Sequence, residues 1–272
     1  MSTLADQYRT AFVTGASTGL GRAFADMLLA EGLEVWGTSR NAARLPPRER
    51  FHPVTLDLGD GAAAERIFHE AEQAAGGFDV VVNNAGFGVF GDFSGTDFAV
   101  WQRQLEAMLV NTARLAHAAL RAMRGRDRGA LVNVSSMAAE FPLPYQSAYN
   151  MTKAGLAALS ESLLTEVAGT GVLVIDLRPG DFRTDFDGSV QRAPEIFTPR
   201  MARVWEAFAR MMRTGPPPGQ AAASLRRALA ARRRGTVRTG RWFQTVMAPL
   251  LVRLAPLSWR RYFQQRYFGA AP

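Results

Sequence analysis

Short apolar runs recur along the first two thirds of the chain, and each is followed by a stretch with helical spacing. The runs are rich in Val, Leu, Ile or Phe and do not alternate strictly between apolar and polar positions. That pattern is typical of parallel strands that are buried on both faces and joined by crossover helices. It predicts strands at 10–14, 33–38, 53–56, 78–82, 130–135 and 172–177.

Alanine-rich segments between these strands carry apolar residues at helical intervals. They predict helices over about 20–31, 61–75, 96–124 and 146–168. Asp60 stands where an N-cap would begin the second helix, and Gly169 or Gly171 stands where the last would stop. The alternation predicts an α/β fold: a single doubly wound, Rossmann-like parallel sheet with helices on both faces.

The alternation of strands and helices ends after the sixth predicted strand, where the chain becomes rich in Pro, Gly, Phe and charged residues. We interpret this segment as a mobile substrate lid over about 181–215 rather than as a linker between domains. Further helices are predicted near 199–213 and 220–234. The length and the 47% apolar content fit one domain over 1–272, which ends in a basic, aromatic extension over about 235–272.

Composition narrows the class of protein. The chain has no cysteine, which excludes disulfides, thiol catalysis and thiolate metal sites. The histidines His52, His69 and His117 lack metal-ligand spacing, so we expect no metal site. The start of the chain lacks an apolar signal core, and no apolar run approaches the roughly 20 residues of a bilayer span. We therefore expect a cytoplasmic protein.

Charge is unevenly distributed along the chain. Residues 1–206 carry 19 basic and 24 acidic side chains, whereas the remainder carries 13 arginines and no acid, for a net charge of +8. Such a basic segment suits an anionic lipid surface, an acidic carrier protein or nucleic acid. Solvated arginines that balance the acidic body are the alternative. We expect no nucleic-acid partner.

Lys153 is the only lysine among the 32 Lys and Arg residues. All other strongly basic side chains are arginines, which serve wherever any cation is sufficient. A lysine at this one position therefore indicates chemistry that needs a compact ammonium on a flexible stem. Tyr149 lies four residues earlier, on the same face of the predicted helix. A nearby cation favours the phenolate and lowers the tyrosine pKa, which would make Tyr149 a usable proton donor and acceptor. An accidental pair on a solvated helix is the alternative.

A glycine-rich turn ends the first predicted strand and leads directly into a helix. It reads Thr14, Gly15, Ala16, Ser17, Thr18, Gly19, Leu20 and Gly21. Glycines allow a tight turn and close backbone approach, while the helix N-terminus offers unpaired N–H groups to a pyrophosphate. The spacing differs from GxGxxG and resembles the TGxxxGxG turn of the short-chain dehydrogenase/reductase family.

Other motifs resemble the same family, in the family's order, over about residues 10–185. The fourth predicted strand is followed by Asn83, Asn84, Ala85 and Gly86, which match the NNAG motif. In the family this motif supports the sheet beside the adenosine part of the cofactor. Asn111 matches an asparagine that holds a water in the proton relay, and Ser136 precedes Tyr149 by the family's thirteen residues. Pro179, Gly180 and Thr184 resemble the PGxxxT segment that contacts the nicotinamide.

Each of these residues has an ordinary structural explanation when taken alone, as a turn, a cap or a strand-end hydroxyl. Together, in the right order, they favour the family, which implies hydride transfer between a nicotinamide and a carbonyl or alcohol carbon. Tyr149 would exchange the proton, and Ser136 would orient the same oxygen. Lys153 would lower the tyrosine pKa and bind the nicotinamide ribose, and Asn111 would complete a water chain to solvent.

Cofactor choice depends on the end of the second predicted strand. The family's NAD enzymes place an acidic residue there, whereas this chain has Ser39 followed by Arg40. Without a carboxylate to repel it, a 2′-phosphate can lie against the guanidinium, so we expect NADP(H) in preference to NAD(H). The resemblance implies a cofactor site made of Gly15, Ser17, Thr18, Gly19, Leu20, Gly21, Ser39, Arg40, Asp57, Leu58, Asn84, Ala85, Gly86, Tyr149, Lys153, Pro179, Gly180 and Thr184.

Apolar residues near the expected cleft predict a lipophilic ketone, aldehyde or alcohol, such as an acyl-chain, sterol-like or retinoid-like compound. Ordinary packing is the alternative for any one of them. They are Phe87, Phe90, Phe93, Phe141, Leu143, Tyr145, Phe182, Phe186, Phe197, Met201 and Trp205.

The C-terminal extension alternates arginines with aromatic residues. This pattern suits peripheral contact with an anionic membrane, a cover over the chain's own core, or a subunit contact. The resemblance implies a homodimer or homotetramer, because homo-oligomers are common in the family. The helix at 146–168 has excess apolar surface for contact either with a second subunit or with the chain's own C-terminal extension. A 3-oxoacyl-carrier-protein reductase is an alternative function, because an acidic carrier can dock on arginines. A non-catalytic NADP(H)-binding redox sensor is another, although binding alone does not require the Ser136, Tyr149 and Lys153 set.

Overall fold

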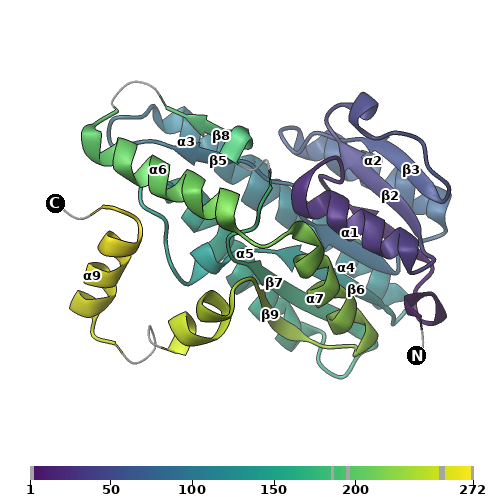
Figure 1. Ribbon diagram of the computed structural model, residues 1–272. Helices are drawn as coiled ribbons and strands as arrows, with labels where there is room; N and C mark the ends of the chain where they lie inside the picture. The colour runs from purple at the N-terminus through teal and green to yellow at the C-terminus, as the bar shows by residue number, and fades with distance from the viewer. Residues whose placement is uncertain (1–2, 185–186, 194–196, 251–254, 271–272) are drawn as a thin grey trace.

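The computed structural model describes residues 3–184, 187–193, 197–250 and 255–270. Its centre is a seven-stranded sheet in which every neighbouring pair is parallel (Figure 1). The spatial order is β3 (Phe51–Thr55), β2 (Glu34–Ser39), β1 (Thr10–Val13), β4 (Val80–Asn83), β6 (Gly129–Val134), β7 (Val172–Pro179) and β9 (Gly235–Thr239). The strand order reverses between β1 and β4, which creates a crevice at the carboxyl ends of these strands. The predicted doubly wound α/β fold is confirmed.

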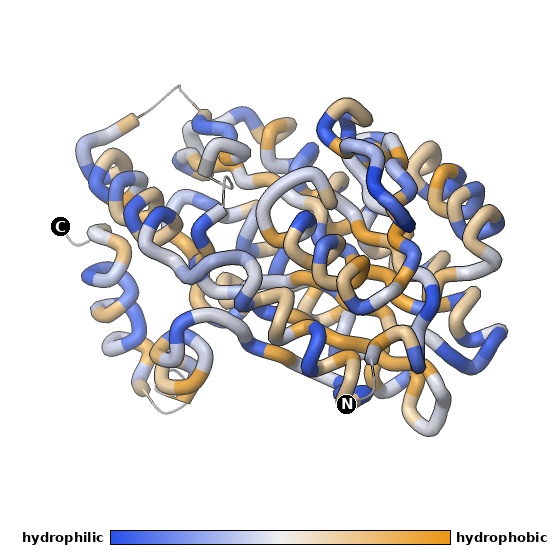
Figure 2. Tube along the Cα trace, turned by 45° about the vertical axis from the view of Figure 1, so that its right-hand side comes forward, coloured by the Kyte–Doolittle hydropathy of each residue, from blue (hydrophilic) through white to orange (hydrophobic). Residues whose placement is uncertain are grey.

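Helices cover both faces of this sheet because successive strand residues are apolar. In β1, Ala11 and Val13 pack on one side and Phe12 packs on the other. The first face is covered by α1 (Gly19–Ala30) and α7 (Pro218–Ala230). The second face is covered by α2 (Gly61–Ala75), α4 (Asn111–Gly125) and α5 (Ser147–Glu166). Figure 2 shows apolar residues running through the central strands between these layers.

Most predicted helices lie within a few residues of their expected bounds. Asp60 caps α2 as predicted, since its carboxylate accepts a hydrogen bond from the backbone N–H of Ala63 at 3.0 Å. The long helix expected at 96–124 is interrupted. It consists of α3 (Phe98–Leu105), a π-helical turn η3 (Glu106–Val110) and α4. Such single π turns inside helices are frequent at functional sites.

The hydrophobic pattern does not predict β9, the seventh strand of the sheet. This edge strand carries an arginine and two threonines, and it follows a run of three arginines. α7 ends at Ala230 rather than at 234, because the chain turns through Arg232, whose φ is 48°, before entering β9. Residues 235–239 therefore belong to the sheet, which corrects their assignment to the C-terminal extension.

The segment expected to form a substrate lid contains regular structure. A short strand β8 (Val190–Arg192) pairs in parallel with β5 (Gly88–Phe90), and both are too short to be recognised from sequence. α6 (Pro199–Thr214) follows, close to its predicted bounds. Phe208 and Met212 of α6 pack with Phe90 in a satellite apolar cluster. Mobility of this lid stays a prediction.

The C-terminal segment runs along the edge of the molecule, away from the N-terminus (Figure 1). It contains a π-helical turn η6 (Phe243–Met247) and the helix α9 (Leu257–Tyr267). Phe268 and Ala270, which follow α9, are buried against the body. The remaining short elements are 3-10 turns: η1 (Leu4–Asp6), η2 (Ala42–Arg44), η4 (Met137–Ala139) and η5 (Asp187–Ser189).

Candidate active site

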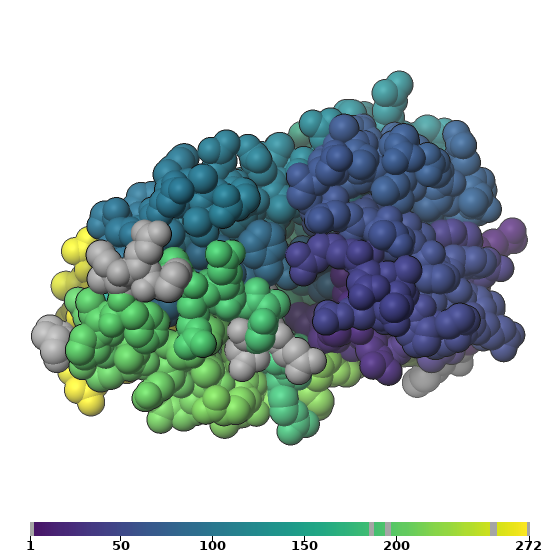
Figure 3. All heavy atoms as spheres, turned by 90° about the horizontal axis from the view of Figure 1, so that it is seen from above, coloured from purple at the N-terminus to yellow at the C-terminus, as the bar shows by residue number. Residues whose placement is uncertain are grey.

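A cavity of about 1850 Å³ begins at the crevice between β1 and β4 and continues to the C-terminal segment. Figure 3 shows the surface hollowed where the purple and blue N-terminal half meets the teal and green segments. Every residue predicted to bind the cofactor lines this cavity. The sheet topology explains this result, because most of the predicted residues lie at or just beyond the carboxyl ends of β1, β2, β3, β4 and β7. Tyr149 and Lys153 lie on α5, which packs against β6 and β7.

The glycine-rich turn between β1 and α1 needs its glycines for stereochemical reasons. Gly15 and Gly19 have φ values of 68° and 55°, in the left-handed region. A Cβ on Gly21 would lie 2.5 Å from Asn84 Nδ2 and closer still to the carbonyl of Gly15. The glycines thus let the turn fold tightly against Asn84, and the N-terminus of α1 lines the cavity, where its backbone N–H groups can bind a phosphate.

Asn84 and Ala85 hold this turn from the neighbouring strand. The backbone N–H groups of both residues donate to Thr14 Oγ1, at 2.8 and 2.9 Å. Asn84 Nδ2 also donates to the Thr14 carbonyl at 3.0 Å. Asn83 lies deeper and donates to Asn133 of β6 at 3.0 Å. The NNAG segment therefore fixes the glycine-rich turn to β4 and β6, in keeping with the supporting role inferred for it.

Ser136, Tyr149 and Lys153 meet at the carboxyl end of β6. A side-chain hydrogen bond joins the hydroxyl groups of Ser136 and Tyr149. Ser136 Oγ also accepts a hydrogen bond from the backbone of Ala138 at 3.0 Å, which fixes the serine at the start of η4. Lys153 Nζ donates to the carbonyl of Val134 at 2.8 Å and lies 5.6 Å from the centre of the Tyr149 ring.

The electrostatics of this group differ from the sequence-based expectation. Burial raises the pKa of Tyr149 to about 12, the hydrogen bond from Ser136 acts in the opposite direction, and Asp181 adds to the rise. Burial also lowers the pKa of Lys153 to about 8, against the effect of Asp176. The expected lowering of the Tyr149 pKa by Lys153 is therefore wrong for the protein alone, because desolvation of the phenolate outweighs it. Tyr149 is a neutral phenol at physiological pH.

Asn111 is placed differently from the other predicted catalytic residues. It follows η3 directly, and its side-chain Nδ2 donates to the carbonyl of Leu58 at 2.8 Å. It is buried and does not line the cavity. A Cβ on Gly61 would collide with the Asn111 side chain, so α2 packs closely at this point. The proposed link from Asn111 to a water chain stays a prediction.

The wall beyond β2 contains a second cation, Arg44, which was not predicted from the sequence. Ser39 and Arg40 lie there as predicted, with Ser39 Oγ accepting from the backbone of Asn41 at 3.2 Å. Arg44, at the end of η2, lines the same wall. Its spacing of four residues from Arg40 was the available sequence signal. Asp57 and Leu58 complete this part of the cavity from the end of β3.

A polar cluster from the C-terminal segment closes the opposite side of the site. Gln244 Nε2 donates to the Asp181 carboxylate and also to Tyr267 Oη, the latter at 3.1 Å. Tyr267 and Asp181 share a further side-chain hydrogen bond. Burial raises the pKa of Asp181, while Gln244 and Arg241 oppose that change. The C-terminal segment thus reaches the residue that follows the Pro179 and Gly180 motif.

Only part of the predicted apolar set lines the cavity. Phe87, Phe141, Leu143 and Phe182 do so, whereas Phe90, Tyr145, Met201 and Trp205 pack in the satellite cluster under α6. Phe93 and Phe197 are exposed, and Phe186 lies outside the described residues. Further apolar side chains of the wall are ones that the sequence did not single out for it, among them Phe208 and Met212 of α6, and Phe243, Ala248, Trp259, Tyr262 and Phe263 of the C-terminal segment.

The chain is similar to known proteins over most of its length. The short chain dehydrogenase family profile matches residues 9–195. Oxidoreductase BOA17 from Botryotinia fuckeliana is 33% identical over 208 residues, which are 74% of this chain and 76% of that protein. The 3-oxoacyl-(acyl-carrier-protein) reductase FabG of Escherichia coli is 33% identical over 182 residues, or 65% of this chain and 75% of that enzyme. A crystal structure of a short-chain dehydrogenase from Streptomyces avermitilis superposes with a TM-score of 0.83 at 30% identity, covering 96% of this chain and 98% of that one.

The fold and the site define an oxidoreductase of the Rossmann type. The chain belongs to the short-chain dehydrogenase/reductase family. It is an NAD(P)-dependent enzyme that interconverts a carbonyl and an alcohol. The glycine-rich turn at the N-terminus of α1 and the cations at the end of β2 line one cavity, and this set of donors fits such a dinucleotide.

Proposed function

We propose that the enzyme uses NADP(H) to reduce a lipophilic ketone or aldehyde, and to oxidise the corresponding alcohol in the reverse direction. The observation that carries this proposal is the neutral, buried phenol of Tyr149. It is hydrogen-bonded to Ser136 inside one cavity that extends from the glycine-rich turn to an apolar wall. The bound cofactor supplies the hydride that a carbonyl carbon accepts.

Tyr149 and Ser136 handle the oxygen of the substrate. As the carbonyl becomes an alkoxide, Tyr149 donates its proton to that oxygen, and Ser136 orients the oxygen by a second hydrogen bond. A pKa of about 12 keeps Tyr149 protonated before the reaction. Lys153 then stabilises the phenolate that remains, because its ammonium lies beside the Tyr149 ring. Oxidation of an alcohol reverses these transfers and needs the phenolate at the start.

The preference for NADP(H) rests on the wall beyond β2. Arg40 and Arg44 both line the cavity there, and Ser39 stands where the family's NAD enzymes carry an acid. Two guanidinium groups favour the additional phosphate of NADP(H). Ser39→Asp should reverse the preference, because a carboxylate repels that phosphate and binds the ribose hydroxyls of NAD(H). The ratio of kcat/KM for NADPH and NADH, measured for wild type and this variant, tests the assignment.

The preference for a lipophilic substrate rests on the aromatic and aliphatic side chains of the distal cavity. Phe141, Leu143, Phe208 and Met212 line it from the body, and α9 lines it from the other side. Each additional buried methylene contributes about 0.8 kcal/mol, so kcat/KM should rise about threefold to fourfold per methylene along a series of straight-chain ketones. A value of kcat/KM that is flat or falls with chain length would contradict this proposal.

A 3-oxoacyl-carrier-protein reductase is the second candidate. It is favoured by Arg260, Arg261 and Arg266, which line the distal cavity and suit an acidic carrier. Reduction of one 3-oxoacyl chain, presented on the carrier protein or as a short thioester, separates the two functions. A large advantage for the carrier-linked chain that disappears in high salt supports the reductase. Equal rates of reduction for the carrier-linked chain and the short thioester favour the free lipophilic substrate.

A further inference from the structure

Exposed apolar side chains gather in the C-terminal segment. Nine of the fourteen exposed large hydrophobic side chains in the described part of the chain lie between residues 242 and 267. Trp242 and Trp259 are 66% and 62% exposed. Aromatic residues of this size are rarely left together in water without a partner surface. These exposed side chains therefore indicate a surface that binds a partner.

Two parts of the segment form this surface, which we call the C-terminal face. Trp242, Val246 and Leu250 follow one another at four-residue intervals along the helical stretch that contains η6. None of these three lines the cavity. The second part is α9, in which no residue is buried. Its exposed apolar side chains are Leu257, Trp259, Tyr262, Phe263 and Tyr267.

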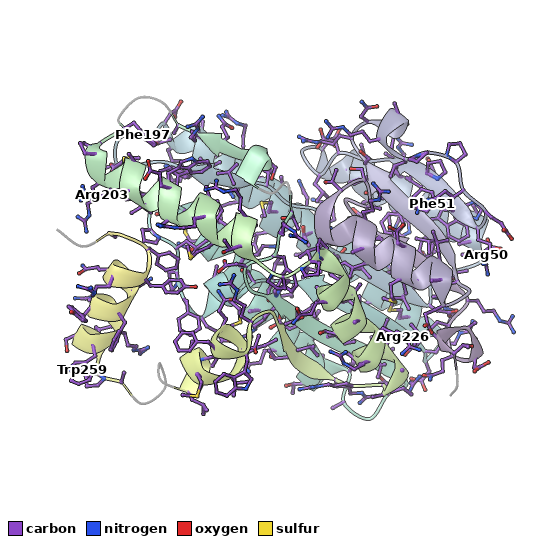
Figure 4. The ribbon with its side chains drawn as sticks, viewed as in Figure 1. Arg50, Phe51, Phe197, Arg203, Arg226 and Trp259 are labelled. Atoms are coloured by element: carbon purple, nitrogen blue, oxygen red, sulfur yellow. The ribbon has the colours of Figure 1, made fainter. Side chains whose placement is uncertain are left out.

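α9 is attached to the body chiefly at its C-terminal end. Gln264 donates to the carbonyl of Pro142, Tyr267 bonds to Gln244, and Arg200 donates to the carbonyl of Ala270 at 2.9 Å. Trp259 lies at the opposite end of the helix, at the margin of the molecule (Figure 4). The N-terminal half of α9 is thus presented outward, where an external surface can reach it.

Charge identifies the kind of surface that fits. The chain carries no acidic residue after Glu206, and Arg241, Arg260, Arg261 and Arg266 lie on or beside the exposed aromatic residues. None of the three arginines of α9 forms an ion pair within the described ranges, whereas Arg241 acts on the Asp181 carboxylate. Arginines beside Trp, Tyr and Phe in amphipathic segments are typical of helices that lie in the interface of an anionic bilayer.

A second copy of the chain fits this face less well. Two identical faces packed together would bring the arginines of both copies into one interface, without an acidic partner in either segment. Like charges placed opposite each other in this way suppress association. Crossing of the bilayer is also disfavoured, because no helix in the described part of the chain is long and apolar enough to span one.

The C-terminal face is continuous with the cavity. Trp259, Tyr262 and Phe263 are each more than half exposed, yet the same side chains line the distal cavity wall. A surface that covers α9 therefore lies at the cavity mouth. A lipophilic molecule dissolved in a bilayer would enter the site there without crossing water.

We propose that the C-terminal face binds the surface of an anionic lipid bilayer and opens the cavity to it. Aromatic side chains enter the headgroup region, and Arg260, Arg261 and Arg266 contact lipid phosphates. Only the entry of substrate from the bilayer rests on the proposed function. Binding to the bilayer rests on the exposed side chains and charges alone.

Vesicle flotation without substrate tests the proposal. The full chain should float with vesicles of mixed phosphatidylglycerol and phosphatidylcholine, and much less with phosphatidylcholine alone. Trp242→Ser combined with Leu250→Ser should weaken binding by about tenfold or more, because two large apolar groups no longer enter the interface. Phe98→Ser is the matched control, since Phe98 is 62% exposed on α3, and it should bind like wild type. Circular dichroism verifies that each variant is folded.

A second variant, in which the charge of α9 is reversed, tests the electrostatic part of the proposal independently. Arg260→Glu combined with Arg261→Glu should abolish the preference for anionic vesicles, since each arginine near such a surface contributes about a fivefold gain in affinity. Wild type that stays in solution with both kinds of vesicle would overturn the proposal. So would a dimer, seen by light scattering, that depends on Trp242 and excludes vesicles. Turnover of a short water-soluble ketone, assayed separately, tests the proposed function and is independent of either outcome.

Discussion

Replacing Lys153 by Met offers a direct reading of the electrostatics at the site. Burial lowers the pKa of Lys153 from its ordinary 10.5 to about 8. At pH values below 8, this difference corresponds to a penalty of about 3 kcal/mol in the free energy of unfolding, at 1.36 kcal/mol per pKa unit. Methionine has a similar length and no charge, so Lys153→Met removes that penalty together with the hydrogen bond to Val134.

The sign of the pH dependence follows from the proton counts. Between about pH 8 and pH 10.5 the unfolded chain holds its lysine proton and the folded chain has lost it, so the stability of wild type rises with pH in that range. Wild type should gain about 2 kcal/mol relative to Lys153→Met between about pH 7 and about pH 9.5. Because Lys153 is the only lysine, no other ammonium side chain titrates in this window, and the tyrosines are common to both proteins.

Urea denaturation of both proteins at the two pH values measures this difference. Wild type should become more stable relative to the variant as the pH rises. Activity of the variant should be strongly reduced relative to wild type at about pH 7, where Lys153 is charged, because the phenolate of Tyr149 loses its cation. A difference in the free energy of unfolding that stays constant across the window would refute the burial of a charged ammonium beside Tyr149.

Three further predictions concern the surroundings of the site. Gly21→Ala should weaken NADPH binding by about tenfold to a hundredfold, because the new Cβ collides with Asn84 and with the Gly15 carbonyl and so displaces the glycine-rich turn. Gly125→Ala is the control, since there is open space around Gly125, and it should bind NADPH as wild type does in a fluorescence titration. Asp181→Asn should lower the pKa of Tyr149, so the pH profile of alcohol oxidation should move to lower pH, and an unmoved profile would contradict the coupling. Asn111→Ala should lower the free energy of unfolding by about 1–3 kcal/mol, since the Leu58 carbonyl loses a buried donor, and chemical denaturation that finds no loss would argue against that contact.

The glycine-rich turn and the Tyr149 and Lys153 pair could be predicted because their chemistry is local. Gly15 to Gly21 are consecutive, and Tyr149 and Lys153 are one helical turn apart, so sequence spacing alone brings each set together. The parallel sheet then aligns the strand ends on one edge. This explains why every predicted cofactor residue lies on one cavity.

Contacts between distant segments were not accessible from the sequence. Gln244 and Tyr267 reach Asp181 only because β9 adds to the edge of the sheet, and β9 itself carries too little apolar character to be recognised. The pKa of Tyr149 was mispredicted for a related reason. Spacing showed the nearby cation, but the extent of burial depends on the whole fold and determines the sign.

Single-turnover reduction of a ketone by Tyr149→Phe tests the central claim most directly. The loss of the proton donor should reduce the rate by about 10²–10⁴-fold while NADPH binding is retained, because the phenol acts on the substrate oxygen. Tyr145→Phe is the matched control, since Tyr145 packs in the satellite cluster outside the cavity. It should retain the wild-type rate. Equal rates for Tyr149→Phe and wild type would show that another group supplies the proton.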